Sequence, residues 1–147
     1  MPELVRSVVS RVRVYFKDRR QSPRLRVRLL FAVSIHRAGK GNGSGRRAQG
    51  LMGHTRDISC NGLALLLPQV HVDGHHLAAD GRELEVRLEM GSSEPIRMVV
   101  MPRRYERLED AELGCAYMIG VRIVRMDEAD RMRYLSFFNE GLENRAA

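Results

Sequence analysis

The feature of the sequence that most limits its fold is an alternation of apolar and polar residues that returns several times along the chain. It is clearest where Leu84, Val86, Leu88 and Met90 alternate with charged side chains. Because successive side chains of a β-strand point to opposite faces, this pattern predicts a strand with one buried face. The same pattern, or a short apolar run, predicts strands at 27–35, 51–58, 62–67, 82–90, 96–106 and 115–125.

Six short strands with turn residues between them favour a small antiparallel barrel, because closure of a sheet removes its exposed edges. The segment 91–95, Gly-Ser-Ser-Glu-Pro, is expected to turn between two of these strands and to make them an antiparallel pair. Residues 36–50 contain five glycines and almost no apolar side chain, so they are expected to form a basic loop within a hairpin. The predicted fold class is mainly β.

Two helices are expected to flank the strands. Near the start, apolar residues recur every three to four positions among arginines, which predicts a short basic amphipathic helix at about residues 3–16. This helix is expected to dock on the domain or on a partner helix, and contact with a membrane surface is the alternative. Near the end, Asp127 is a candidate N-cap, and Gly141 is expected to end the second helix. The predicted division is a helix and linker at 1–18, a barrel domain at 19–142 and a tail at 143–147.

Composition indicates a soluble chain of one domain. Hydrophobic residues make up 44% and charged residues 29% of the 147 residues, as is typical of globular proteins. The longest apolar runs are far shorter than the roughly 20 residues that span a bilayer, and no secretory signal is expected. Cys60 and Cys115 lack the spacing of a zinc site or a disulfide framework, which predicts reduced thiols and a cytoplasmic location.

Charge is distributed unevenly along the chain. Residues 1–56 contain fourteen Lys and Arg against two acids, whereas residues 57–147 contain eleven against sixteen. A solvated surface does not require this separation, so the basic segment predicts an anionic partner. A nucleotide, a nucleic acid and a membrane surface would each satisfy the charge, and charge alone does not choose among them.

No pattern of catalytic or metal-binding residues stands out. The histidine-rich segment 71–76 is predicted to be a surface loop with a turn at Asp73-Gly74, rather than a metal site. Ser59 and Cys60 have no histidine in a recognisable partner motif, and no phosphate-binding glycine fingerprint occurs. The chain is therefore predicted to have no catalytic residue and no metal site.

Two short motifs carry more specific chemistry, and the first is rich in arginine. Arg19, Arg20 and Arg24 lie just before the first predicted strand, and Pro23 stiffens the backbone between them. Planar guanidinium groups fit phosphate oxygens and the O6/N7 edge of guanine bidentately. Taken alone, the motif could equally be a basic solvated linker.

The second motif, Asp57-Ile-Ser59-Cys-Asn-Gly62, lies at the tip between two predicted strands. The Asp57 carboxylate can accept from the N1–H and N2–H₂ of guanine together, and the Ser59 hydroxyl can donate to a ligand oxygen. Gly62 is expected to take a positive φ in the turn. Taken alone, this motif could be only a well-made β-turn.

Together, the two motifs resemble the paired signature of the PilZ family, Arg-x3-Arg before the first strand and Asp-x-Ser-x2-Gly at the end of the second. Here these are Arg20…Arg24 and Asp57…Gly62, and the resemblance covers roughly residues 19–140. It implies a six-stranded antiparallel PilZ-like barrel with a C-terminal helix. It also implies that the ligand is the bacterial second messenger cyclic di-GMP and that the protein is a signalling receptor without a further cofactor.

The resemblance assigns roles to the arginines. Arg20 and Arg24 would hold the phosphates and the Hoogsteen edges of the guanines, and Arg19 would help to hold a second, stacked ligand molecule. Mutual repulsion among these arginines predicts that a ligand with two phosphates neutralises and orders the segment. Such ordering would reorient the helix at 3–16 and signal to a protein partner.

The resemblance also assigns roles to the second motif. Asp57 and Ser59 would read a guanine, and Gly62 would let the turn approach the ligand. The Gly-rich loop at 36–50 widens the spacing between the motifs, and its role stays open. Two alternatives remain, namely a basic small barrel that binds nucleic acid and a PilZ-like adaptor that binds a protein without a nucleotide. The first lacks a cluster of aromatic residues that would stack on bases.

Overall fold

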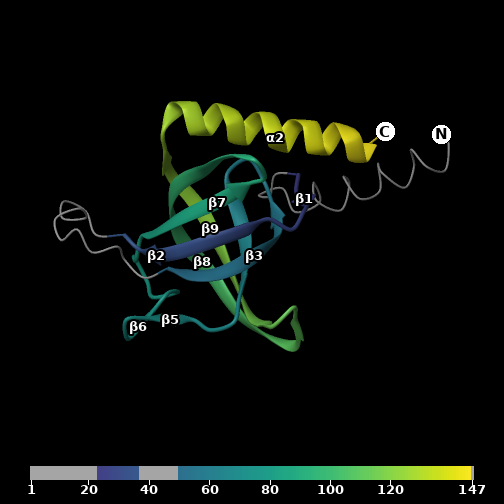
Figure 1. Cartoon of the computed structure of the whole chain (residues 1–147). Helices are drawn as coiled ribbons and strands as arrows, with labels where there is room; N and C mark the ends of the chain where they lie inside the picture. The colour runs from purple at the N-terminus through teal and green to yellow at the C-terminus, as the bar shows by residue number, and fades with distance from the viewer. Residues whose placement is uncertain (1–22, 37–49, 147) are drawn as a thin grey trace.

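The computed structural model describes residues 23–36 and 50–146 of the chain (Figure 1). Antiparallel strands wind into a barrel, and one long helix lies across an end of it. The strands are β1 (Leu25–Arg26), β2 (Leu30–Ile35), β3 (Leu51–Ile58), β4 (Gly62–Leu67), β5 (His71–Val72), β6 (His75–His76), β7 (Leu84–Met90), β8 (Ser93–Glu112) and β9 (Cys115–Met126), and the helix is α2 (Glu128–Ala146).

Six of the strands close into a ring. Their order is β3-β2-β7-β8-β9-β4, and a further pairing between β3 and β4 closes the sheet. Every pairing in the ring is antiparallel, and β1 adds two residues beside the end of β3. The predicted six-stranded antiparallel barrel with a C-terminal helix is therefore confirmed. The helix predicted at 3–16 and most of the loop predicted at 36–50 lie outside the described residues.

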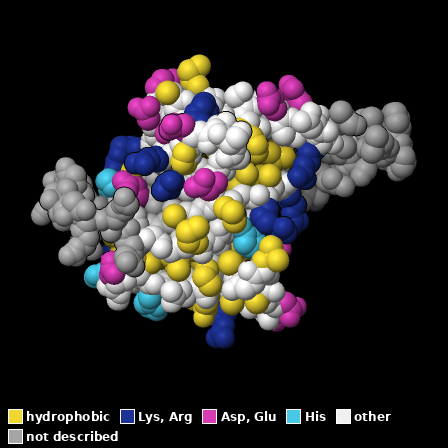
Figure 2. Space-filling view, in the orientation of Figure 1, with side chains coloured by type: hydrophobic (Ala, Val, Ile, Leu, Met, Phe, Trp, Pro, Cys, Tyr) yellow, Lys and Arg dark blue, Asp and Glu magenta, His cyan; other side chains and the backbone are white. Residues whose placement is uncertain are grey.

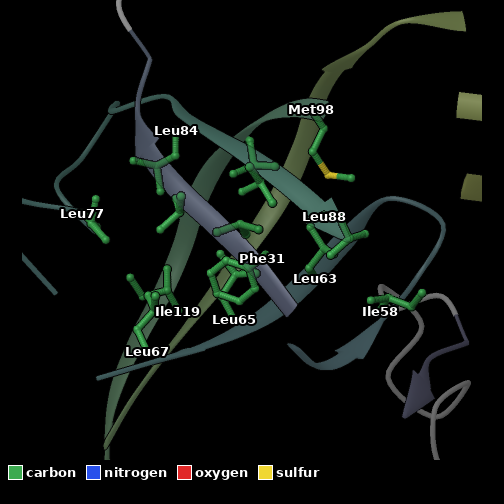
Figure 3. Close-up of a cluster of buried hydrophobic side chains, with 14 of the residues drawn as sticks. Phe31, Ile58, Leu63, Leu65, Leu67, Leu77, Leu84, Leu88, Met98 and Ile119 are labelled. Carbon is green, nitrogen blue, oxygen red and sulfur yellow. The ribbon is translucent and has the colours of Figure 1, made fainter. Parts of the chain in front are cut away.

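The interior of the barrel is filled mainly by aliphatic side chains, with Phe31 and Met98 among them. The alternation that predicted β7 is confirmed, because Leu84, Val86 and Leu88 are buried while Glu85 and Arg87 are exposed. Side chains from β2, β3, β4, β7, β8 and β9 meet in one cluster (Figure 3). Its labelled members are Phe31, Ile58, Leu63, Leu65, Leu67, Leu77, Leu84, Leu88, Met98 and Ile119.

A second, smaller cluster lies on the outer face of β4. All six residues of β4 are buried, and Ala64 and Leu66 pack against Cys115, Met118 and the partly buried Leu108. These covering residues come from the β8–β9 hairpin, which runs beyond the barrel (Figure 1) and is longer than the sequence predicts. β8 extends to Glu112, well past the predicted strand end at residue 106. The continuous apolar run of β4 thus reflects burial on both faces.

His54 lies at the margin of this outer cluster. It is only 5% exposed, its Nε2 lies 3.4 Å from the Glu112 carbonyl oxygen, and its Nδ1 has no hydrogen-bond partner among the described residues. Burial lowers the pKa of the His54 imidazole, and the positive charge of Arg28 adds to this effect. His54 is therefore held in its neutral form between the barrel and the hairpin.

Two further boundaries predicted from the sequence are also wrong. A single strand was expected from residue 27, but the chain forms β1 and then bends before β2 begins at Leu30. The bend is held by Thr55, whose hydroxyl donates to the Val27 carbonyl (2.6 Å) and accepts from the Leu29 amide (2.9 Å). The helix does not end at Gly141 but continues to Ala146, and Gly141 instead provides space for the Leu25 side chain.

Helix α2 begins after Asp127, whose carbonyl accepts from the Arg131 amide at 2.8 Å. Tyr134 and Phe138 on its inner side are buried against the barrel core. Hydrophobic side chains are visible on the face of the barrel that carries β2 and β3 (Figure 2), where Leu30 and Met52 are 58% and 61% exposed. No helix among the described residues is long and apolar enough to cross a membrane.

Candidate ligand-binding site

The structure brings Arg24 of the first motif into direct contact with Asp57 of the second. Arg24 immediately precedes β1, and β1 pairs with β3 so that Arg26 lies opposite Asp57. This register brings the Arg24 side chain to the end of β3, where its Nη1 donates to Asp57 Oδ1 at 2.6 Å. The two side chains are 27% and 14% exposed, so they face the surface at the margin of the barrel. Arg19 and Arg20 lie outside the described residues.

An irregularity in β3 sets the direction of Asp57. The pairing of β3 with β4 shifts between Thr55 and Asp57, so that Thr55 lies opposite Leu65 and Asp57 lies opposite Ala64. Leu65 points into the barrel and Ala64 points outward. The extra residue, Arg56, therefore turns Asp57 to the outer face, where strict alternation from Thr55 would have turned it inward.

Ser59 lies inside the turn rather than on its surface. It is 1% exposed, and its hydroxyl donates to Asn61 Oδ1 at 3.0 Å. The Ser59 amide donates to the Gly62 carbonyl at 2.9 Å, which closes the turn. The Ser59 carbonyl in turn accepts from the Tyr134 hydroxyl at 2.7 Å. Ser59 thus shapes the turn that carries the second motif.

Gly62 is required for a reason that differs from the one predicted. Its φ is not positive, since it is not among the residues with left-handed backbone in the described part of the chain. A Cβ at this position would instead lie 2.6 Å from the Val121 carbonyl oxygen of the neighbouring strand. The absence of a side chain lets β4 and β9 approach each other at the site.

A surface pocket of about 470 Å³ adjoins the Arg24–Asp57 pair. Its base is made of small residues, Gly62, Ala64 and Gly120, on the outer face of β4 and β9. Such a base leaves room for a flat group to lie against the sheet. The remaining lining residues are Arg24, Asp57, Asn61, Leu63, Arg103, Arg104, Val121 and Arg122.

Three arginines of this pocket were not predicted as site residues. Arg103 and Arg104 come from β8 and Arg122 from β9, on the side of the pocket across from Asp57. Arg104 is paired with Gly120 in the sheet, and its side chain lies over this glycine. A Cβ on Gly120 would be 3.2 Å from Arg104 Cγ. With Arg24, the described residues of the pocket carry four guanidinium groups and one carboxylate. This composition favours a polyanionic ligand that also offers hydrogen-bond donors to Asp57.

The histidine-rich segment forms the small β5–β6 hairpin, in which Asp73 and Gly74 have φ of 53° and 80°. The predicted turn is confirmed, although the segment is a hairpin rather than a loop. His76 Nδ1 accepts from the Ala78 amide at 3.0 Å. Across residues 23–36 and 50–146, no group of three or more His, Cys, Asp or Glu side chains is placed to hold a metal ion.

Fold and pocket together define a small closed β-barrel that presents an arginine-lined surface site. The family model for the PilZ domain matches residues 18–140, and the chain therefore belongs to the PilZ domain family. This confirms the resemblance drawn from the two motifs. A comparison with curated proteins found no match.

Several solved structures share the fold. The PilZ domain of YcgR from Escherichia coli, solved with cyclic di-GMP, has a TM-score of 0.60 at 12% identity and covers 88% of this chain and 95% of that one. The structure of the inhibitor of motility MotI/DgrA from Bacillus subtilis has a TM-score of 0.58 at 17% identity, and the match covers 86% of this chain and 52% of that one. The structure of MrkH, a cyclic di-GMP-dependent transcription regulatory factor, has a TM-score of 0.56 at 16% identity, and the match covers 80% of this chain and 48% of that one. The chain thus spans about half the length of the latter two proteins.

Proposed function

We propose that this chain is a cyclic di-GMP receptor and that the ligand binds in the pocket beside Arg24 and Asp57. The observation that carries the proposal is that Arg24 and Asp57, one residue from each motif, line the same pocket as Arg103, Arg104 and Arg122. Membership of the PilZ family supports the choice of ligand. The YcgR domain, which shares the fold, was solved with cyclic di-GMP.

The residues of the pocket match the chemistry of a guanine dinucleotide. A guanidinium fork pairs with the O6/N7 edge of guanine or with two phosphate oxygens, and the Asp57 carboxylate accepts from N1–H and N2–H₂. The Arg24–Asp57 ion pair holds the two side chains next to each other at the pocket. The ligand must replace this 2.6 Å contact with its own contacts to the two side chains.

Ser59 retains its proposed role in reading a guanine, although it would act by a different route. Its hydroxyl already binds Asn61, so a contact with the ligand would require that Asn61 move or that the hydroxyl act as an acceptor. Gly62 supports the site by allowing β4 and β9 to form the base of the pocket. Both residues therefore belong to the proposed binding site.

The proposal extends to a switch in the N-terminal arginine segment. Arg19 and Arg20 would add contacts to the phosphates, and binding would fix residues 18–24 across the barrel face. The attached segment 3–16 would then move and signal to a protein partner in the cytoplasm, with no catalytic step. Limited proteolysis near Lys17 tests this switch, because equal cleavage with and without cyclic di-GMP would contradict it.

Calorimetric titration of cyclic di-GMP tests the receptor function. We expect binding by the wild type and a loss of at least about tenfold in affinity for Arg24→Ala and Asp57→Ala, since hydrogen bonds to charged groups contribute about 1.5–3 kcal/mol each. Arg87→Ala is a matched control, because it removes an exposed arginine from β7, outside the pocket. Absent wild-type binding, or equal affinity in all four proteins, would refute the proposal.

A second titration separates this function from nucleic-acid binding. Single-stranded oligonucleotides should bind weakly or not at all in physiological salt. Binding to oligonucleotides that falls steeply with salt, together with no heat from cyclic di-GMP, would instead support the nucleic-acid alternative. If cyclic di-GMP does not bind and a protein partner is still recruited, the adaptor alternative holds.

A further inference from the structure

Tyr134 of α2 is buried directly behind the proposed binding site. Its side chain has no exposed surface, and its hydroxyl donates to the Ser59 carbonyl at 2.7 Å and lies 3.4 Å from the Gly62 carbonyl. Burial raises the pKa of this phenol well above its usual value, so the hydroxyl keeps its proton across the physiological range. Tyr134 is therefore a permanent donor to the backbone of the turn.

The turn is held from three directions. Within the turn, the Ser59 amide donates to the Gly62 carbonyl at 2.9 Å. From β9, the Ile123 amide donates to the Asn61 carbonyl at 2.8 Å. From the helix, Tyr134 donates to Ser59. The helical contact is the one that comes from outside the sheet, and it ends at the turn that follows Asp57.

The same helix also contacts the segment that carries Arg24. Gly141 lies against the Leu25 side chain so closely that a Cβ on the glycine would overlap it. One turn further on, the Arg145 guanidinium donates to the Arg26 carbonyl. Leu25 and Arg26 form β1, directly after Arg24. Helix α2 thus spans both halves of the site, with Tyr134 at the turn and its last two turns at β1.

We propose that α2 sets the geometry of the ligand-binding site from behind, with Tyr134 as a positioning residue that acts through the Ser59–Gly62 turn. The inference rests on the proposed function of the pocket. Removal of the hydroxyl leaves the buried Ser59 carbonyl without this donor, so the turn relaxes and Asp57 leaves its place opposite the arginines. The coupling between the two events is reciprocal. If the docking of α2 on the barrel raises the affinity for the ligand by some factor, ligand binding must favour the docked helix by the same factor.

The test compares Tyr134→Phe with a control on the same helix. Phe138→Leu also removes buried atoms from α2, since Phe138 is 4% exposed, but no hydrogen bond links it to the turn. Calorimetry below the melting transition should show cyclic di-GMP binding weakened about five- to tenfold in Tyr134→Phe, roughly the value of one hydrogen bond. Phe138→Leu should bind within twofold of the wild type, although it melts earlier.

Amide hydrogen exchange in the ligand-free proteins provides a second measurement that needs no ligand. The amides of Ser59 and Ile123 should exchange faster in Tyr134→Phe than in Phe138→Leu, because only the first variant loses the contact with the turn. Equal exchange at these amides, or equal affinities in the two variants, would overturn the inference. If the wild type does not bind cyclic di-GMP, the proposed function fails, and exchange at the turn alone then decides whether Tyr134 positions it.

Discussion

Gly62→Ala should damage the protein at the contact between β4 and β9. An added Cβ would lie 2.6 Å from the Val121 carbonyl oxygen, and this neighbour is backbone that cannot rotate away. Either β4 or β9 must therefore shift by several tenths of an ångström within a hydrogen-bonded pair. Overpacking of this kind costs about 1–3 kcal/mol, which lowers Tm by roughly 3–10 °C in a chain of this length. Urea unfolding followed by circular dichroism measures the loss.

Gly120→Ala is the matched comparison, because it adds the same methyl group to the same pocket base. Its nearest neighbours would be Arg104 Cγ at 3.2 Å and Nε at 3.3 Å, atoms of a flexible side chain. We expect less than about 0.5 kcal/mol of lost stability here, with weaker cyclic di-GMP binding because Arg104 is displaced. If both variants lose the same stability, the argument from the Val121 carbonyl is wrong.

Three further predictions follow from individual side chains. Arg122→Ala should weaken cyclic di-GMP binding about tenfold or more in calorimetry and change the free energy of unfolding by less than about 0.5 kcal/mol. Because the folded protein lowers the pKa of His54, the unfolded chain binds a proton first as the pH falls, so stability should drop as the pH falls below about 6.5. Urea titrations should show a shallower drop in His54→Gln. Because the pKa of Tyr134 is raised, its contribution to stability is complete below about pH 10 and declines at higher pH, and Tyr134→Phe should lose this alkaline decline.

The strands could be predicted from the sequence because burial on one face imposes an alternation that local reading detects. β7 shows this most clearly, with three buried aliphatic residues separated by charged ones. The break between β1 and β2 could not be predicted, because it depends on the Thr55 hydroxyl, which is distant in sequence. The continuation of the helix beyond Gly141 could not be predicted for a similar reason. This glycine makes room for the Leu25 side chain, which is distant in sequence, and does not mark the end of the helix.

The site could be predicted only in part. The two motifs pick out Arg24 and Asp57 as candidate ligand-binding residues, and the structure places both at the pocket. Arg103, Arg104 and Arg122, in contrast, look like ordinary solvent-facing arginines in the sequence. Only the register of β4, β9 and β8 brings them to the pocket. The outward direction of Asp57 depends on the shift at Arg56, which leaves no recognisable mark in the amino-acid pattern.

The order of strands in the barrel affects how the protein is expected to unfold. Strands β2, β3 and β4 form one three-stranded unit and β7, β8 and β9 another, and the two units meet along β2–β7 and β4–β9. The pocket straddles the second of these joints, with Arg24 and Asp57 on one side and Arg104 and Arg122 on the other. A bound dinucleotide would therefore contact both units and hold them together. Neither unit alone carries the whole site, so saturating ligand should slow the separation of the two units during unfolding.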